Sequence, residues 1–506
     1  MACASNMNED NLQSLLTLPL CTLTKGRGGK RHARAAEAKL QEKLDLWAGG
    51  QSKGVWSAFL GSAARGERFR KLHAGTTKKA EEGISASTLR SIITLTSQGL
   101  PGKACKLLLS NGIASWCKGT RAKVQKLFPS AGMWEIKHHK SEVEPFDQDE
   151  VLHAIKKLGR GKSPGPSGLR TEHLLDLLAN SQAREGVLEG LTAFVNAVAF
   201  GSVDPACAQL LCSGRVVPLL KKDGSIRPLV VGECLRNLVA TCWLGRVLEK
   251  LECDLHPRHL GLGRKTGVEN AVHSAKLMAS TLKPSQVLVK VDFSNAYNTV
   301  DRVHLVEAVH RRCPELSGWT SWTLEPPVEL AAGDSPVWST TGVQQGDPLS
   351  PLLFTLATSE IATALDVLHN TAERPDRLVQ QWYLDDGLFV VEKEDFLPLM
   401  DKLEQAAGQI GLKLNRAKCE VFGDSEDILI GATQAKCQGS TQRHHWSYLG
   451  CPLDNALPDH PTFSDALKRC EMLAERVALV DDPEALLAIW RQCLGACRVQ
   501  HLTATC

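Results

Sequence analysis

The stretch QQWYLDDGLFVV, residues 380–391, contains two adjacent acids, Asp385 and Asp386, between two apolar runs. The flanks are rich in aromatic and β-branched residues, so the stretch predicts two strands joined by a tight turn. A solvated polar turn is the simplest explanation of the two acids. A turn that holds a metal ion is the alternative, and the rest of the sequence decides between them.

Composition places the chain among globular proteins, because 43% of its 506 residues are hydrophobic and 23% are charged. It contains no apolar run of about 18 residues, so we expect no membrane span. The N-terminus lacks the pattern of a secretory signal, and the 17 cysteines therefore predict reduced thiols. We expect a nuclear or cytoplasmic protein that is not secreted.

Charge is spread unevenly along the chain. Residues 1–140 contain 23 Lys and Arg against 9 Asp and Glu, whereas the remainder contains 36 against 47. A basic extension of this kind suits contact with a phosphate backbone, and a solvated helical face is the open alternative. One basic cluster within this region could contact RNA or serve nuclear import and comprises Arg27, Lys30, Arg31 and Arg34.

A third acid, Asp292, stands where the apolar strand expected over residues 287–291 ends. Three acids at the ends of apolar strands are destabilising unless cations neutralise them. Transfer of a nucleotide to a growing strand uses two divalent ions about 3.5–4 Å apart, and such hard cations prefer carboxylate oxygens. Asp292 and Asp385 are 93 residues apart in sequence, so only the fold can bring them together.

The stretch GRVVPLLKKDGSIRPLVV, residues 214–231, predicts a β-hairpin, because Asp-Gly favours a tight turn between two β-rich runs. The basic residues Lys221, Lys222 and Arg227 then gather near its tip. They could be solvated, or they could bind phosphate groups.

Five motifs in a fixed order resemble the palm motifs of reverse transcriptases. Two further motifs, GKSPGPSGL (161–169) and KKDGSIRPL (221–229), are most similar to the non-long-terminal-repeat retrotransposon branch, and the resemblance covers roughly residues 145–460. The five motifs are VDFSNAY (291–297), GVQQGDPLSP (342–351), YLDD (383–386), LNRAKCEVF (414–422) and YLGCPL (448–453).

The resemblance implies an α/β (α+β) right-hand polymerase with fingers, a palm and a short helical thumb, preceded by a basic, mostly helical N-terminal extension. The boundaries that we expect are 1–140 for the extension, 141–285 for the fingers, 286–455 for the palm with its primer grip, and 456–506 for a partial thumb. Within the palm, a fingers segment is expected to be inserted at about residues 303–343.

The resemblance also implies a catalytic site. Asp292, Asp385 and Asp386 would be the metal-binding carboxylates, joined by the carbonyl of Phe293, and they would bind two Mg²⁺ ions, with Mn²⁺ as an alternative. Lys418 would protonate the pyrophosphate, although a lysine here could also be merely solvated.

Further residues would surround the substrate. The ring of Tyr297 would exclude a ribose 2′-hydroxyl, and Gln345 and Gly346 would lie against the incoming nucleotide and template. Arg227, with Lys221 or Lys222, would hold the triphosphate. The primer grip would comprise Trp446, Tyr448, Leu449 and Gly450.

The function implied is that of an RNA-directed DNA polymerase of retrotransposon origin, which extends a DNA primer on an RNA template with deoxynucleoside triphosphates. One rival is a catalytically silent RNA-binding relic, or a domesticated reverse-transcriptase domain. Another is an RNA-dependent RNA polymerase, against which Tyr297 argues.

Overall fold

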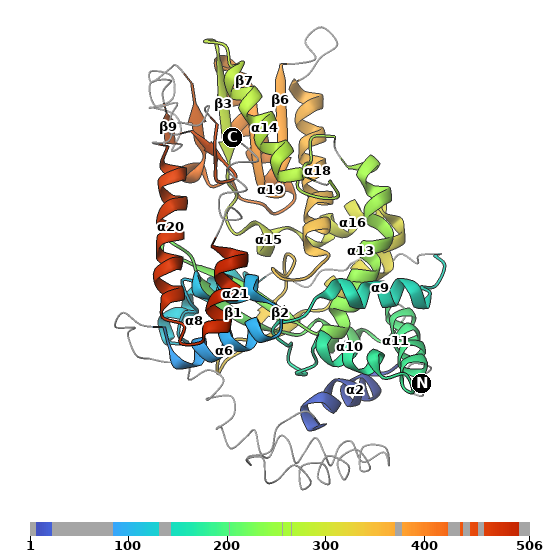
Figure 1. Ribbon diagram of the computed structural model, residues 1–506. Helices are drawn as coiled ribbons and strands as arrows, with labels where there is room; N and C mark the ends of the chain where they lie inside the picture. Colours follow the sequence, from blue (N-terminus) through green and yellow to red (C-terminus); the bar gives the residue numbers. More distant parts are fainter. Residues whose placement is uncertain are drawn as a thin grey trace. The chain divides into compact units, whose positions relative to one another are not determined.

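In the computed structural model the chain forms two compact units, which are described separately. Figure 1 labels their helices and strands. The first unit comprises residues 1–77, 112–247 and 309–350, and the second comprises residues 78–111, 248–308 and 351–506. The structure describes residues 7–22, 84–130, 143–201, 203–255, 257–264, 266–369, 377–423, 436–438, 446–453 and 460–494.

The basic cluster at residues 27–34 lies outside the described residues. Within the stretches that the structure does describe, no helix is both long and apolar enough to cross a membrane.

The first unit contains a four-stranded sheet in the order β2-β1-β4-β5. Strands β1 (Gly214–Leu220) and β2 (Ile226–Gly232) form the predicted antiparallel hairpin, which is thereby confirmed. In its turn, Gly224 adopts φ +74° and the Asp223 carboxylate accepts the Ser225 N–H at 2.9 Å. Strand β4 (Val328–Ala331) is parallel to β1 and pairs with β5 (Val337–Ser339).

Helices account for most of the rest of the first unit. Three helices, α13 (Cys234–Asp254), α16 (Arg302–Arg312) and α18 (Ser350–His369), each include a boundary between the units. The others are α2 (Glu9–Thr22), α8 (Lys118–Leu127), α9 (Gln148–Leu158), α10 (Thr171–Ala179), α11 (Arg184–Ala199), α12 (Pro205–Cys212), η2 (Pro314–Leu316) and α17 (Ser317–Leu324).

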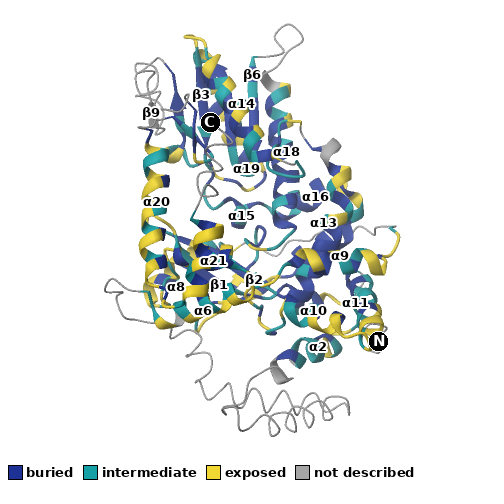
Figure 2. Cartoon of the chain, in the orientation of Figure 1, coloured by how far each residue is buried: buried dark blue, intermediate teal, exposed yellow. Residues whose placement is uncertain are grey.

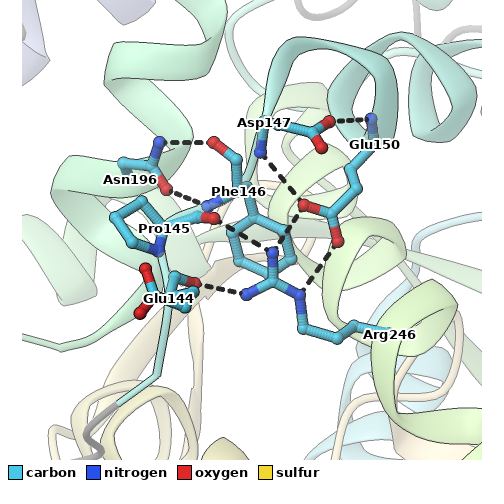
Figure 3. A network of polar contacts seen from close by, with 7 residues as sticks. All are labelled: Glu144, Pro145, Phe146, Asp147, Glu150, Asn196 and Arg246. Carbon is cyan, nitrogen blue, oxygen red and sulfur yellow. Dashed lines mark hydrogen bonds and ion pairs between the residues drawn. The ribbon is translucent and has the colours of Figure 1, made fainter.

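A polar network fixes the start of α9 in the first unit (Figure 3). Asp147 caps the helix, and its carboxylate accepts the Glu150 N–H at 2.8 Å while the Glu150 side chain accepts the Asp147 N–H at 3.0 Å. Arg246 from α13 pairs with Glu150 at 2.5 Å, and its guanidinium lies 3.7 Å above the ring of Phe146. Asn196 bonds both the N–H and the carbonyl of Phe146, so three helices hold this one turn of chain.

The second unit contains a five-stranded sheet in the order β6-β7-β3-β8-β9. Strand β3 (Gln286–Val291) lies between β7 (Asp386–Glu392) and β8 (Glu420–Phe422) and is antiparallel to both. Its apolar residues are buried, as the sequence predicts for a central strand (Figure 2). The edges are β6 (Leu378–Tyr383) and β9 (Lys436–Gln438). With the helices around it, this sheet confirms the expected mixed α/β fold class.

The sheet of the second unit is accompanied by helices and a short second hairpin. The hairpin consists of β10 (Ser447–Tyr448) and β11 (Cys451–Pro452). The helices are α6 (Ala86–Ser97), α7 (Pro101–Leu108), α14 (Gly267–Ser280), α15 (Ala296–Thr299), η3 (Lys393–Asp395), α19 (Phe396–Gln409), η4 (Arg416–Lys418), α20 (Pro461–Ala478) and α21 (Pro483–Cys493).

Four of these helices share one apolar core. Helices α6 and α7 precede all other elements of the second unit in sequence, yet they pack against α20 and α21 near its end. Arg476 of α20 also donates to the Leu108 carbonyl at the end of α7. The extension expected over residues 1–140 is therefore divided between the two units, because α6 and α7 bury their apolar faces here while α8 belongs to the first unit. The core comprises Ile92, Ala104, Cys105, Leu108, Leu473, Val477, Val480, Ala485, Ile489 and Cys493.

This core predicts a difference between two positions on α21. Ile489 is fully buried, whereas Leu487 is 51% exposed. Ile489→Ala should lower the free energy of unfolding by about 2–5 kcal/mol, and Leu487→Ala should change it by no more than about 0.5 kcal/mol. Urea unfolding of the full chain, followed by tryptophan fluorescence, measures both, and equal shifts would contradict the packing of the four helices.

Candidate active site

Strand pairing in the second unit brings together the acids predicted from the sequence. Tyr383 pairs with Asp386 across the β6–β7 hairpin, so Leu384 and Asp385 form its turn. Val291, the last residue of β3, pairs with Gly387 at the start of β7. Asp292, which follows Val291, therefore lies at the same end of the sheet as the two hairpin acids.

The electrostatics of Asp386 indicate how concentrated this charge is. Burial, followed by the negative charges of Asp385 and Asp292, raises the pKa of Asp386 from its ordinary value of 3.8 to about 6, and the charge of Lys290 opposes the rise. Lys290 also pairs with Glu420 at 3.2 Å, so its charge is shared. At Asp386, burial and the neighbouring negative charges therefore outweigh the positive charge of Lys290, and a bound metal ion would oppose them.

The donor set fits a divalent metal of the hard type. Carboxylate oxygens are the ligands that Mg²⁺ prefers, and at polymerase sites one or two carboxylates act together with substrate phosphates rather than as a complete protein cage. Among the described residues, no group of three or more His, Cys, Asp and Glu is placed so that it could hold a metal ion by itself. The contribution of the Phe293 carbonyl stays a prediction.

Asn415 fixes Asp292 and was not predicted as a site residue. Its backbone N–H donates to the Asp292 carbonyl at 2.8 Å, and its side-chain amide donates to the Asp292 carboxylate at 3.2 Å. The two segments also touch at the neighbouring residues, because Phe293 and Leu414 form an isolated β-bridge. The asparagine lies inside the LNRAKCEVF motif, but nothing in that motif indicates a partner 123 residues earlier.

Tyr297 lies in α15, and its ring stacks on that of Phe354 in α18. The ring centroids are 4.7 Å apart and the planes differ by 9°, so the orientation of the tyrosine is fixed by packing. A fixed ring suits a steric role, but exclusion of a 2′-hydroxyl stays a prediction. Lys418 is exposed at the end of η4, and its acid role also stays a prediction.

The expected primer grip is the β10–β11 hairpin, and two of its side chains face inward. Trp446 is 1% exposed and Tyr448 is fully buried. The Tyr448 hydroxyl donates to the Asp386 carbonyl at 3.2 Å, and burial, followed by the charge of Asp386, raises its pKa, so it stays protonated. The turn residues Leu449 and Gly450 would then be the ones that contact a primer. Their φ angles are +48° and +78°.

The first unit contains the other predicted substrate residues. Gln345 accepts the Val230 N–H of β2 through its backbone carbonyl at 2.7 Å. Gly346 has φ +122°, and a Cβ there would collide with the Val230 carbonyl, so glycine is needed for the loop to approach the strand. Lys221, Lys222 and Arg227 are exposed on the β1–β2 hairpin, and their binding of phosphate stays a prediction.

A buried ion pair that was not predicted supports this loop. Arg236, near the start of α13, pairs with Asp347 at 2.7 Å, and their side chains are only 7% and 6% exposed. Arg236 also donates to the side chain of Gln344, whose amide donates to the Cys212 carbonyl at 3.0 Å. Separation of such a pair would leave an uncompensated buried charge. Positions of the loop that separate Arg236 from Asp347 are therefore strongly disfavoured.

Comparison with known proteins agrees with this geometry. Residues 219–453 match the family described as Reverse transcriptase (RNA-dependent DNA polymerase). This part of the chain is similar to the reverse transcriptase family. The match includes the turn and the second strand of the first-unit hairpin, the loop that contains Gln345 and Gly346, and all three second-unit acids. The match implies, as general properties of that family, a nucleic-acid template and primer and dependence on a divalent metal ion.

Two proteins that are similar to this chain carry the names of retrotransposable elements. One is the Retrotransposable element SLACS 132 kDa protein of Trypanosoma brucei gambiense, 25% identical over 339 residues, which is 64% of this chain and 26% of that protein. The other is the Retrovirus-related Pol polyprotein from type-2 retrotransposable element R2DM of Drosophila melanogaster, 28% identical over 130 residues, or 22% of this chain and 11% of that protein. The predicted resemblance to the non-long-terminal-repeat branch is confirmed.

The chain spans about a quarter or less of the length of these relatives. Among solved structures, apo telomerase from Candida tropicalis is similar with a TM-score of 0.37 and 11% identity, covering 71% of this chain and 75% of that one.

The contact between Asn415 and Asp292 yields a prediction. Asn415→Asp keeps the shape of the side chain but replaces the amide donor with a second negative charge beside Asp292. The turnover of primer extension should fall about 10²-fold, because a misplaced reacting group has effects of that order, while the affinity for the primer–template stays unchanged. Asn180→Asp, the same change in a first-unit cap, is the control, and equal turnover in the two variants would contradict the role of Asn415.

The pKa of Asp386 yields a second prediction, on stability. The folded chain retains the proton of this carboxyl up to about pH 6, whereas the unfolded chain loses it near 3.8. Stability therefore falls as pH rises through this window. In EDTA at pH 8, Asp386→Asn should raise the free energy of unfolding by on the order of 1–2 kcal/mol, allowing for partial exposure.

Urea unfolding at pH 8 and pH 5 measures this difference, which should shrink at pH 5. Mg²⁺ at pH 8 should stabilise the wild type more than the variant, because binding to the folded state alone raises stability. Equal unfolding energies of the two proteins at pH 8 in EDTA would contradict the shift.

Proposed function

We propose that the chain is an RNA-directed DNA polymerase of retrotransposon origin that extends a DNA primer on an RNA template by two-metal-ion nucleotidyl transfer. The observation that carries the proposal is the group of three carboxylates at one end of the second-unit sheet, with the pKa of Asp386 raised to about 6. Such a group is unfavourable by itself and becomes favourable when divalent cations bind.

In the reaction, the 3′-hydroxyl oxygen of the primer attacks the α-phosphorus of a deoxynucleoside triphosphate. The bond from that phosphorus to the bridging oxygen breaks, pyrophosphate leaves, and the hydroxyl proton is released. Two Mg²⁺ ions, or Mn²⁺ in their place, would supply activation of the hydroxyl and stabilisation of the leaving group. The residues that would hold them are Asp292, Asp385 and Asp386, with the Phe293 carbonyl.

The chain's other residues would orient the substrates. Asn415 keeps the Asp292 carboxylate in place through its amide. Tyr297, fixed against Phe354, would exclude a ribose 2′-hydroxyl and so favour deoxynucleotides. Lys418, which is exposed, would donate a proton to the pyrophosphate. In the first unit, Arg227 with Lys221 or Lys222 would bind the triphosphate, because charged donors form strong hydrogen bonds with phosphate oxygens.

Primer extension on an RNA template tests the proposal. Purified full chain with Mg²⁺ should incorporate deoxynucleotides, and the double variant Asp385→Asn/Asp386→Asn should lose about 10³-fold or more in rate, because metal ions supply several kcal/mol of transition-state stabilisation. Incorporation by the wild type no greater than by the double variant would refute an active polymerase.

Two further outcomes separate the rivals. RNA binding without incorporation would identify a catalytically silent RNA-binding relic. Preference for ribonucleotides would identify an RNA-dependent RNA polymerase and would contradict the role assigned to Tyr297.

A further inference from the structure

The turn that carries Asp385 has an unusual backbone. Leu384, directly before the acid, adopts φ +55°. A branched residue rarely occupies this left-handed region unless its surroundings enforce it. The position of Asp385 therefore depends on whatever holds Leu384 in this conformation.

The residues Arg258–Gly261, named here the supporting segment, lie beside the hairpin and are bonded to it. The Trp382 N–H donates to the Arg258 carbonyl at 2.9 Å, and the Leu260 N–H donates to the Trp382 carbonyl at 2.8 Å. Together these bonds form a parallel bridge between His259 and Trp382. Trp382 also pairs with Gly387 of β7, so its backbone is held on both sides.

Gly261 brings the supporting segment against the turn itself. A Cβ at this position would lie 2.7 Å from the Leu384 nitrogen and 3.2 Å from the Tyr383 carbonyl carbon. Both are backbone atoms, so no side-chain rotation could relieve the contact. From the other direction, a Cβ on Gly267 of α14 would collide with the Leu260 carbonyl. The segment is thus held between α14 and the turn, without space for added atoms.

Aromatic packing extends the contact toward the other metal-binding acid. The Trp382 ring is nearly parallel to that of His259, at 17° and 5.9 Å between centroids, and to that of Phe293, at 9° and 6.4 Å. His259 is 1% exposed and Phe293 is 5% exposed. Since Phe293 follows Asp292 directly, one tryptophan connects the supporting segment with the backbone next to Asp292.

We propose that the supporting segment sets the position of the catalytic turn, and that Gly261 is its positioning residue. Gly261 touches no substrate in this proposal. It acts through Leu384 on Asp385, and it does so because the absence of a Cβ lets two backbones approach. The proposal rests on the polymerase function proposed above.

The test compares Gly261→Ala with Gly408→Ala in the full chain. Gly408 lies on α19 of the same unit, and a Cβ at this position would have no atom within 4 Å. Its replacement therefore controls for the substitution itself. In Gly261→Ala, kcat should fall about 10²-fold, and the Mg²⁺ concentration for half-maximal rate should rise severalfold. The dissociation constant of the primer–template should not change. Gly408→Ala should match the wild type in all three.

A second measurement does not depend on activity. Amide hydrogen exchange in residues 378–391 should be faster by about tenfold in Gly261→Ala than in the wild type, because the turn opens more often, and it should not change in Gly408→Ala. If the wild type makes no DNA, the proposed function fails while this measurement still tests the supporting segment.

Unchanged kcat, or unchanged exchange in the hairpin, would overturn the proposal. Loss of primer–template binding in parallel with kcat would also overturn it, since that indicates a general structural defect. If Gly261→Ala does not fold, His259→Leu replaces it, because this change removes the ring that stacks on Trp382 and leaves Gly261 intact. A loss of kcat with unchanged primer–template affinity supports the proposal, and a wild-type kcat overturns it.

Discussion

Concentrated negative charge is the constraint on which the second unit depends. Asp292, Asp385 and Asp386 lie at the end of a sheet whose strands are buried, and removing carboxylates from water is unfavourable without compensation. The raised pKa of Asp386, about 6, reflects that imbalance. The Asn415 amide and the shared charge of Lys290 compensate in part. A cation bound at this end of the sheet would compensate further.

Each of the three acids is supported by a segment that is distant in sequence. Asn415 bonds Asp292, the Tyr448 hydroxyl bonds the Asp386 carbonyl, and Gly261 abuts the turn next to Asp385. These supports come from three different segments of the second unit. Carboxylates that repel one another would separate if only their own strands held them, because strand ends are the least restrained part of a sheet. External contacts on each acid counteract that repulsion.

The sequence predicted the strands and turns that carry the acids better than it predicted the residues that support them. The strand before Asp292, the acidic hairpin and the Asp223-Gly224 turn each depend on local patterns, namely apolar runs and turn residues, and all three were correctly predicted. Asn415 and the Arg236–Asp347 pair were missed, because a polar residue shows no partner until the chain folds. The inward direction of Tyr448 was missed for a related reason, since a motif identifies a residue but not the side of the hairpin on which it packs.

Both units position their loops by the same physical means. In the first unit Gly346 lets a loop approach the Val230 carbonyl, and a buried ion pair then fixes that loop. In the second unit Gly261 lets a segment approach Leu384, and stacked rings fix that segment. Backbone atoms have fewer conformations than side chains, so a loop located by backbone contact is held more tightly than one located by a flexible side chain. At such a position the smallest addition, a single methyl group, is expected to disturb the site more than a larger change to an exposed side chain.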